Sequence, residues 1–254
     1  DDASGTFAKQ TLDKYGVDAS LFEDDNRPTS LKQRYKSENK TLIRINYLQD
    51  LSIPKKLQDK VISKFKKLIK NVDAVIFSDF NYGLLPTILI NKCISEAKDK
   101  KIFISADSQS SSQIGDIGKF KNVDLITPTE REARLSLKNN EDGLIILSDK
   151  IQKSTRAKHV ILKLNQQGVL INSYKNKQIP TSKIEALNPN PIDVAGAGDS
   201  LLIAATLALC SGGDIYESSY IGSLAAALQV GQTGNLPLKN KSLIKELEQC
   251  RHLF

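Results

Sequence analysis

The chain of 254 residues contains no methionine and no tryptophan, and it has only three cysteines and two histidines. Cys93, Cys210 and Cys250 are scattered, and none belongs to a Cys-x-x-Cys motif. A disulfide framework and a structural zinc site are therefore not expected, and a reducing cytoplasm fits this cysteine usage. No run of about eighteen apolar residues is present to cross a bilayer. The sequence predicts a soluble globular protein of one large or two small domains, with no membrane partner.

The missing methionine is unusual because a native chain begins with one. This chain begins at Asp1, and no apolar stretch of a signal peptide follows. We therefore expect that the true N-terminus or the methionine-derived residues are absent from the sequence. An intact mass that matches the 28.0 kDa of the sequence would contradict this expectation.

The charge is moderately basic, with 36 Lys and Arg against 29 Asp and Glu and a formal net charge of +7. The densest basic stretch, residues 55–70, interleaves Lys with Leu, Ile, Val and Phe at helical spacing. This pattern indicates a solvated helix face rather than a nucleic-acid-binding stripe. We expect no nucleic-acid partner, and the basic excess favours anionic small substrates.

Short β-branched runs alternate with amphipathic stretches from residue 72 onward, which predicts an α/β fold with a mostly parallel sheet covered by helices. Strands are expected at residues 72–78, 101–106, 123–127 and 159–164, and a hairpin at 168–172 with 178–184, turning at 175–177. Pro86 can open one helix from its first turn, and Thr129 with Glu132 forms a capping box for another. Further helices are expected at residues 198–209, 215–230 and 242–250.

The first seventy residues show a different pattern. Within residues 26–50, two stretches at 32–36 and 41–47 alternate apolar and polar residues with period two. This indicates a small β lid of non-contiguous short strands that stands off the α/β body with one solvent-exposed face. Exposed strand edges favour pairing, so a homodimer through the lid is expected.

The segment at residues 188–200 carries the strongest chemical signal. Gly196 and Gly198, separated by Ala197, let the backbone approach a ligand closely, and an apolar helix follows. The free N–H groups at its start and the helix dipole together favour an anion. Asp199 would repel that anion unless it accepts a proton from an attacking nucleophile, which is the arrangement that phosphoryl transfer requires. The alternative is a glycine turn in which Asp199 is an ordinary helix N-cap.

Residues 193–199, Asp-Val-Ala-Gly-Ala-Gly-Asp, resemble the Asp-Thr-x-Gly-Ala-Gly-Asp signature of the ribokinase-like, PfkB-type carbohydrate kinases. The resemblance implies that Asp199 deprotonates a sugar hydroxyl and that Asp193 contributes to the cofactor site. It also implies an anion hole for the transferred phosphoryl group, formed by the amides of Gly196, Ala197, Gly198 and Asp199. The family uses Mg-ATP and folds as a three-layer α/β/α sandwich with a β lid over the sugar. Residues 1–254 are then expected to form one kinase domain that lacks the family's N-terminal strands.

Three further segments resemble the family's nucleotide site. Residues 127–132 are similar to Thr-Pro-Asn-x-x-Glu, which implies that Glu132 helps to organise magnesium, although Thr129 replaces Asn and the capping box can coexist. Residues 163–168 stand in place of Thr-x-Gly-x-x-Gly, and from this segment Lys163 and Gly168 are expected ATP contacts. Residues 231–235 resemble the loop near the adenine, which adds Gly234 and Asn235. The alternative there is a helix C-cap at Gly231.

The first half of the chain resembles the heptose 7-phosphate kinase domains of lipopolysaccharide-precursor synthesis, at residues 1–5, 16–18, 27–34, 42–45 and 78–83. A phosphorylated sugar needs fixed cations, and Lys32, Arg34 and Arg44 on the lid strands could supply them. The alternative is that they are solvated strand charges. Asp79 lies just past the end of a strand and could bind sugar hydroxyls. Asp107 is a further expected substrate ligand, in the sequence Asp107-Ser108-Gln109 where those kinases have Asp-Pro-Lys.

The sequence thus predicts an ATP-dependent sugar kinase that requires Mg²⁺, acts in the cytoplasm and phosphorylates D-glycero-D-manno-heptose 7-phosphate. A ribose, fructose or nucleoside kinase of the same fold is one alternative. A degenerate, non-catalytic nucleotide-binding module is another, because Thr129, Asn165 and Gln109 depart from the family pattern.

Overall fold

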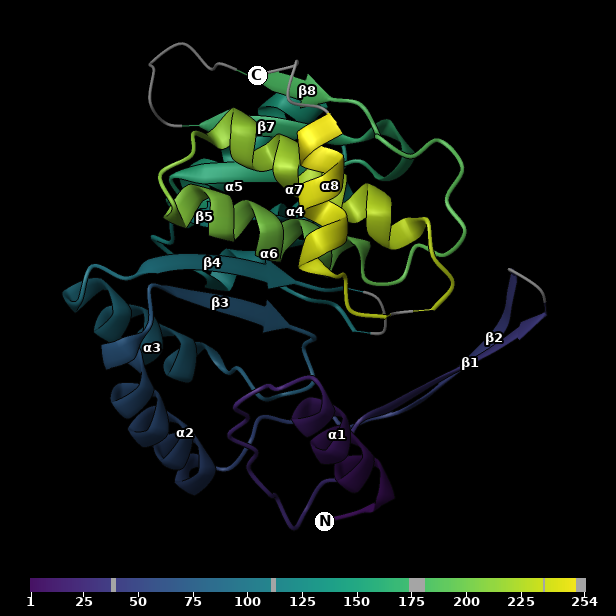
Figure 1. Ribbon diagram of the computed structural model, residues 1–254. Helices are drawn as coiled ribbons and strands as arrows, with labels where there is room; N and C mark the ends of the chain where they lie inside the picture. Colours follow the sequence, from purple (N-terminus) through teal and green to yellow (C-terminus); the bar gives the residue numbers. More distant parts are fainter. Residues whose placement is uncertain (38–39, 111–112, 174–180, 235, 250–254) are drawn as a thin grey trace.

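The computed structural model describes residues 1–37, 40–110, 113–173, 181–234 and 236–249. Its centre is a six-stranded sheet in the order β3-β4-β5-β6-β7-β8 (Figure 1). Strands β3 to β6 are parallel, and β7 pairs antiparallel with both β6 and β8. The bounds are β3 Ala74–Asp79, β4 Phe103–Ser108, β5 Leu125–Ile126, β6 His159–Lys163, β7 Val169–Ser173 and β8 Ser182–Ile184. The predicted α/β fold with a mostly parallel sheet is confirmed.

Helices cover both faces of this sheet (Figure 1). One face packs against α6 and α7, with α8 outside them, and the other face packs against α3 and α5, with α2 and α4 outside them. The helix bounds are α2 Lys55–Leu68, α3 Thr87–Asp99, α4 Glu130–Leu137, α5 Leu144–Thr155, α6 Ala197–Cys210, α7 Ile215–Val230 and α8 Asn240–Gln249. Short 3₁₀ turns are η1 Ile69–Asn71, η2 Ile117–Lys119 and η3 Asn165–Gln167. No helix in the described part of the chain has the length and apolar character that a bilayer crossing needs.

Alternation along each strand separates two apolar cores. Phe77, Ile104 and Leu162 belong to the core that contains the apolar side chains of α3 and α5. Leu125 and Ile161 belong to the other core, together with side chains of α6 and α7. Within each strand, the residues on either side of one of these apolar residues face the opposite layer of helices. This alternation decides which polar side chains meet at the ends of the strands.

Local signals in the sequence account for several boundaries. The predicted capping box at Thr129 and Glu132 is present and starts α4. A second capping box, Asp214 with Glu217, starts α7 at the predicted residue. Pro86 is the N-cap of α3 rather than a first-turn residue, one position earlier than predicted. The turn predicted at residues 175–177 lies outside the described residues.

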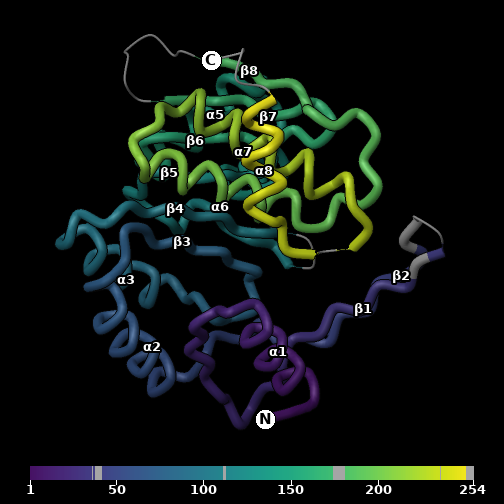
Figure 2. Tube along the Cα trace, viewed as in Figure 1, coloured from purple at the N-terminus to yellow at the C-terminus, as the bar shows by residue number. Residues whose placement is uncertain are grey.

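The lid is a two-stranded antiparallel ribbon, β1 Leu31–Ser37 and β2 Lys40–Tyr47, which projects away from the sheet in Figures 1 and 2. The two alternating stretches within residues 26–50 are strands, as their pattern predicted, and they pair with each other, which the pattern did not predict. An amphipathic hairpin satisfies its inner backbone groups by itself, which isolated short strands cannot do. Arg27 anchors its base by donating hydrogen bonds to the carbonyl oxygens of Tyr82 and Leu51.

The N-terminal helix α1, Ala3–Lys14, was not predicted, and it lies beside the base of the lid in Figure 2. Asp2 caps it by accepting from the Gly5 N–H, and the same carboxylate accepts from the Thr29 N–H. One aspartate therefore joins α1 to the segment that leads into the lid.

Candidate active site

Three polar side chains lie at the carboxyl ends of neighbouring strands on the α6 face of the sheet. Ser78 of β3 and Asp107 of β4 are register partners, and Lys163 is the last residue of β6. The parity of each strand places all three opposite the α3 core, since Phe77, Ala106 and Leu162 belong to that core. Lys163 Nζ reaches across the end of β5 to Asp107 Oδ2 at 2.7 Å. This edge is where ligands bind in open parallel sheets.

The N-terminus of α6 lies over these strand ends. Gly196 is its N-cap at φ 81°, a left-handed conformation that favours glycine, and no side chain caps the helix. Asp199 stands in the first turn, with its Oδ1 3.4 Å from Ser78 Oγ. The alternative of Asp199 as an N-cap is therefore wrong, because Gly196 holds that position. The carboxylate instead points to the end of β3.

Gly198 keeps the helix close to Lys163. A Cβ added at Gly198 would lie 3.1 Å from Lys163 Nζ. The lysine ammonium thus lies beside the predicted anion hole, and a side chain at Gly198 would crowd it. The first turn of α6 brings together a cation, the aspartate and backbone N–H groups that favour negative charge.

Lys163 and Asp107 form a buried ion pair, with their side chains 13% and 2% exposed. Burial raises the pKa of Asp107 to about 6, with Lys163 opposing the rise and Glu132 and Asp199 adding to it. Burial lowers the pKa of Lys163, but the carboxylates of Asp107, Glu132 and Asp199 outweigh burial and raise it above its ordinary value. Lys163 therefore keeps its proton, while Asp107 titrates at mildly acidic pH.

The raised pKa of Asp107 predicts a pH-dependent stability. Because the carboxyl binds a proton more tightly in the folded chain than in the unfolded chain, where its pKa is near 3.8, stability from protonation is lost as the pH rises from about 4 to about 6. Asp107→Asn removes this titration. Urea unfolding should show wild type losing about 2 kcal/mol relative to Asp107→Asn between pH 4 and pH 7. Parallel stability profiles would contradict the assignment.

Glu132 lies at the start of α4 and is buried. Its Oε1 accepts from the Ser110 N–H at 3.0 Å, and its Oε2 accepts from the Thr129 N–H at 2.7 Å. Within the described residues, no group of three or more His, Cys, Asp or Glu side chains is arranged to hold a metal ion. The magnesium role of Glu132 stays a prediction, and both oxygens already have backbone donors.

Asp193 and Gly234 of the predicted cofactor site are brought together. Asp193 Oδ1 accepts from the Ala195 N–H, and Oδ2 accepts from the Gly234 N–H at 3.3 Å. The loop before α6 is thereby tied to the loop after α7. Gly231 is the C-cap of α7, as the alternative for this loop held. Asn235 lies outside the described residues, so only Gly234 of that pair is placed.

Gly168 separates η3 from β7 at φ 82°. A Cβ there would lie 1.9 Å from the Ile184 carbonyl oxygen, so β8 leaves no room for a side chain. The close approach of β8 explains this glycine without a nucleotide, and its ATP contact stays a prediction.

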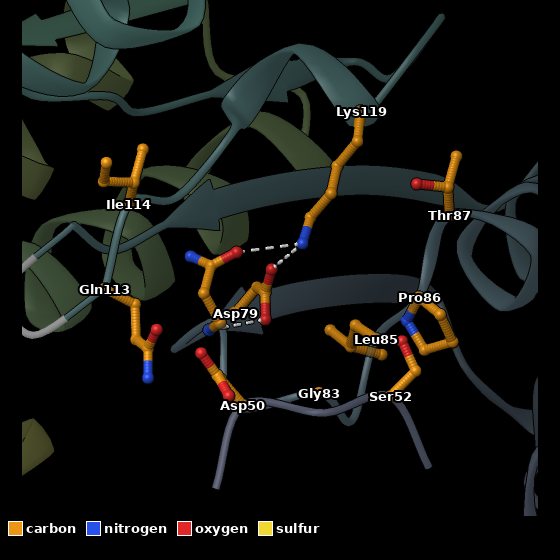
Figure 3. A pocket seen from close by; sticks show the side chains of 11 residues that line it. Asp50, Ser52, Asp79, Gly83, Leu85, Pro86, Thr87, Gln113, Ile114 and Lys119 are labelled. Carbon is orange, nitrogen blue, oxygen red and sulfur yellow. Dashed lines mark hydrogen bonds and ion pairs between the residues drawn. The ribbon is translucent and has the colours of Figure 1, made fainter. Parts of the chain in front are cut away.

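Asp79 lies on the opposite face of β3 from Ser78, and it does not join Asp199. Its carboxylate is ion-paired with Lys119 and accepts from the Asn81 N–H at 2.9 Å (Figure 3). Asn81 in turn accepts from Lys119 Nζ at 3.0 Å. These groups line a cavity of about 330 Å³ beside Asp50 and Gln113 (Figure 3). The sugar-binding role of Asp79 stays a prediction, and this polar cavity is its surroundings.

The lid cations share one face of the ribbon. Arg34 and Arg44 are direct cross-strand partners, and Lys32 is two residues from Arg34 on the same face. Like charges opposite each other destabilise a ribbon unless an anion binds between them. Lys32 Nζ lies 5.2 Å and 5.0 Å from the ring centroids of Phe80 and Tyr82, which orients this face toward the loop after β3.

Sequence reasoning did not select Ser78 and Lys119 as site residues. Ser78 belonged to a predicted strand and to the segment 78–83 that resembles heptose 7-phosphate kinase domains, but it was given no role, although alternation shows that it and Asp79 must face opposite layers. Lys119 carried no local signal, because its partner Asp79 is distant in sequence.

The chain is similar in sequence to known proteins. The profile described as pfkB family carbohydrate kinase matches residues 1–240. The bifunctional protein HldE of a Nitratiruptor species is 28% identical over 237 residues, and that of Helicobacter hepaticus is 28% identical over 251 residues. These alignments cover 92% and 96% of this chain and 48% and 50% of the relatives. The chain therefore spans about half the length of the curated relatives it matches.

Solved structures share the fold. Phosphofructokinase-2 from Escherichia coli in complex with potassium superposes with a TM-score of 0.77 at 16% identity, covering 98% of this chain and 80% of that chain. Ribokinase from Giardia lamblia superposes with a TM-score of 0.74 at 17% identity, with the same two coverages. At these identities the likeness establishes the fold alone, and the predicted ribokinase-like fold is confirmed.

Proposed function

We propose, because this chain belongs to the pfkB family of carbohydrate kinases, that it transfers the γ-phosphoryl group of ATP to a hydroxyl of D-glycero-D-manno-heptose 7-phosphate. The observation that carries the proposal is the position of Asp199 in the first turn of α6, above the ends of β3, β4 and β6. The resemblance of residues 1–83 to heptose 7-phosphate kinase domains supports the choice of sugar. Residues 1–254 form one kinase domain in this proposal.

Asp199 acts as the general base in this proposal. A sugar hydroxyl beside its carboxylate loses its proton as the oxygen attacks the γ-phosphorus. The backbone amides of Gly196, Ala197, Gly198 and Asp199 stabilise the charge of the transferred group, helped by the positive end of the helix dipole. The glycines allow the phosphoryl group to approach this backbone closely.

The cofactors in this proposal are ATP and Mg²⁺. The carboxylates of Asp107, Glu132 and Asp199 all act electrostatically on the single ammonium of Lys163, so the site carries excess negative charge that a divalent cation would offset. When bound with ATP, Mg²⁺ neutralises phosphate charge. Glu132 would hold it through water, because both of its oxygens already accept from backbone N–H groups. Lys163, Gly168, Asp193 and the loop with Gly234 and Asn235 would contact the nucleotide.

A phosphate on the sugar would bind the cationic face of the lid. Arg34 and Arg44 are paired directly across the two strands of the lid. Lys32 lies on the same face and extends it toward the loop after β3. Guanidinium groups bind phosphate oxygens in bidentate geometry. Asp79 and Asp107 remain candidate ligands for sugar hydroxyls. An uncharged sugar would not need the three lid cations Lys32, Arg34 and Arg44. Their presence therefore favours a sugar phosphate over ribose, fructose or a nucleoside.

ADP formation with a panel of acceptors tests this proposal. The full chain is incubated with Mg-ATP and D-glycero-D-manno-heptose 7-phosphate, fructose 6-phosphate, fructose, ribose or adenosine. We expect the largest kcat/KM with the heptose phosphate. A preference for an uncharged acceptor would support the alternative kinases, and ATP binding without turnover on any acceptor would support a non-catalytic module.

We also propose that the protein forms a homodimer through the lid and works in the cytoplasm, where ATP is available and the free thiols of Cys93 and Cys210 stay reduced. The lid face opposite the cations carries Tyr35, Ile43 and Tyr47, each about half exposed. A second lid would cover this apolar face.

Sedimentation tests the dimer. The wild-type chain should sediment at twice 28.0 kDa, and Ile43→Asp should sediment as a monomer because it places a charge on the apolar face. A monomeric wild type at micromolar concentration would contradict the proposal.

A further inference from the structure

The position of Lys163 does not fit a residue with only a structural role. Its side chain is 13% exposed, and its ammonium lies beside the first turn of α6, 3.1 Å from where a Cβ at Gly198 would stand. The N-terminus of a helix is its positive end, so a cation there is unfavourable unless negative charge accompanies it. Asp107 supplies one such charge at 2.7 Å. A buried ion pair adds little net stability compared with apolar side chains of similar size. The pair therefore points to a ligand rather than to folding.

The surroundings of Lys163 indicate what that ligand is. Gly198 and Asp199 belong to the turn that would receive the phosphoryl group, and Lys163 approaches this turn from the sheet side. The segment after β4 supplies no cation at this point, because Asp107 is followed by the uncharged residues Ser108 and Gln109. One ammonium, supplied from β6 instead of from the segment after β4, can occupy the region beside the anion hole.

We propose that Lys163 contacts the transferred phosphoryl group and that Asp107 is a positioning residue that holds the ammonium in place. This inference rests on the proposed kinase function and gives Asp107 a role different from that of a sugar ligand. During transfer the sugar O–H bond breaks and its proton goes to Asp199. The oxygen forms the new bond to the γ-phosphorus, and the bond from that phosphorus to the β-phosphate oxygen breaks, leaving its electron pair on ADP. Lys163 keeps its proton throughout and only stabilises charge.

Lys163→Met tests the catalytic contact, because it removes the charge and keeps the length of the side chain. We expect kcat with the heptose phosphate to fall about 100-fold, as when one preorganised donor to a transition state is lost. Calorimetric titration should show ADP affinity unchanged within about threefold, because ADP lacks the transferred group. Lys158→Met is the matched control, since Lys158 pairs with Asp124 at the opposite end of β6 and is exposed. Its kcat should match that of wild type.

Asp107→Asn tests the positioning role. It should lower kcat about tenfold while the KM for the sugar stays within about twofold, since the lysine loses its anchor but no sugar contact is removed. A raised sugar KM with unchanged kcat would overturn the proposal and identify Asp107 as a sugar ligand. Wild-type kcat in Lys163→Met would overturn it as well.

The double variant Asp107→Asn/Lys163→Met separates catalysis from folding. Removing both charges leaves neither member of the Asp107–Lys163 pair buried without its partner, so the double variant should be more stable than Lys163→Met alone. We expect its kcat to remain about 100-fold below wild type. Recovery of activity together with stability would show that Lys163 is only structural. If wild type itself phosphorylates none of the acceptors, the proposed function fails, whereas an active wild type with an equally active Lys163→Met defeats this inference alone.

Discussion

Asp199→Asn should lower kcat by about 10³-fold to 10⁴-fold and leave ATP affinity within about threefold of wild type. The substitution preserves the shape of the side chain in the first turn of α6 but removes its ability to accept a proton. General-base catalysis contributes about 10²-fold to 10⁴-fold. Ser78, whose Oγ lies 3.4 Å from Asp199 Oδ1, and the protonated Lys163 are not bases that could replace the carboxylate. Steady-state ADP formation gives kcat, and calorimetry gives the ATP dissociation constant.

Asp149→Asn is the matched control for this prediction. Asp149 lies on α5 and pairs with Lys153 four residues on, so the substitution also removes one carboxylate from a helix. Its kcat should equal that of wild type. Full turnover in Asp199→Asn would refute the assignment of the base. Weaker ATP binding with the kcat of wild type at saturating ATP would indicate that Asp199 acts in nucleotide binding.

Arg34→Glu should raise the KM for heptose 7-phosphate about 100-fold and leave kcat and the kinetics of any uncharged acceptor nearly unchanged. Reversing one charge removes a phosphate ligand and adds a repulsive one, and charge-assisted hydrogen bonds of this kind contribute about 1.5–3 kcal/mol each. The lid should stay folded. The change replaces a like-charge pair, Arg34 with Arg44, by a pair of opposite charges across the ribbon.

Lys64→Glu controls for the change in net charge. Lys64 is an exposed residue of α2, and its reversal shifts the net charge by the same two units. Both variants are compared on the sugar phosphate and on fructose. Equal effects of Arg34→Glu on the two acceptors would contradict phosphate binding at the lid, and equal effects of the two variants would indicate a nonspecific electrostatic field.

Much of the fold could be predicted because its signals are local. Hydrophobic runs with β-branched residues marked β3, β4 and β6, the capping box at Thr129 and Glu132 marked α4, and alternation marked the lid. The position of Asp199 in the first turn of α6 followed from two glycines and an apolar run. The pairing of β1 with β2 was missed, since alternation shows that a strand has one solvent-exposed face but does not show which other strand it pairs with. Helix α1 was missed because no apolar stripe marks it, and none of its residues is buried.

The relations within the site were harder to predict because they join residues far apart in the chain. Asp107 and Lys163 meet only because β4 and β6 flank the very short β5. Asp79 and Lys119 meet on the other face, where a turn and η2 come together. Alternation along β3 predicts that Ser78 and Asp79 face opposite sides of the sheet. Which of the two faces α6 can be said only when the register of β3 with its neighbouring strand is known.

Phosphorus NMR of the reaction mixture tests the central claim most directly. The full chain is mixed with Mg-ATP and an equal amount of D-glycero-D-manno-heptose 7-phosphate, and the spectra follow the fate of the γ-phosphorus. The proposed function predicts that one ADP forms for each new phosphate ester on the heptose, with little inorganic phosphate, and that Asp199→Asn abolishes the new signal. Release of inorganic phosphate without a heptose bisphosphate, or no consumption of ATP by the wild-type chain, would contradict it.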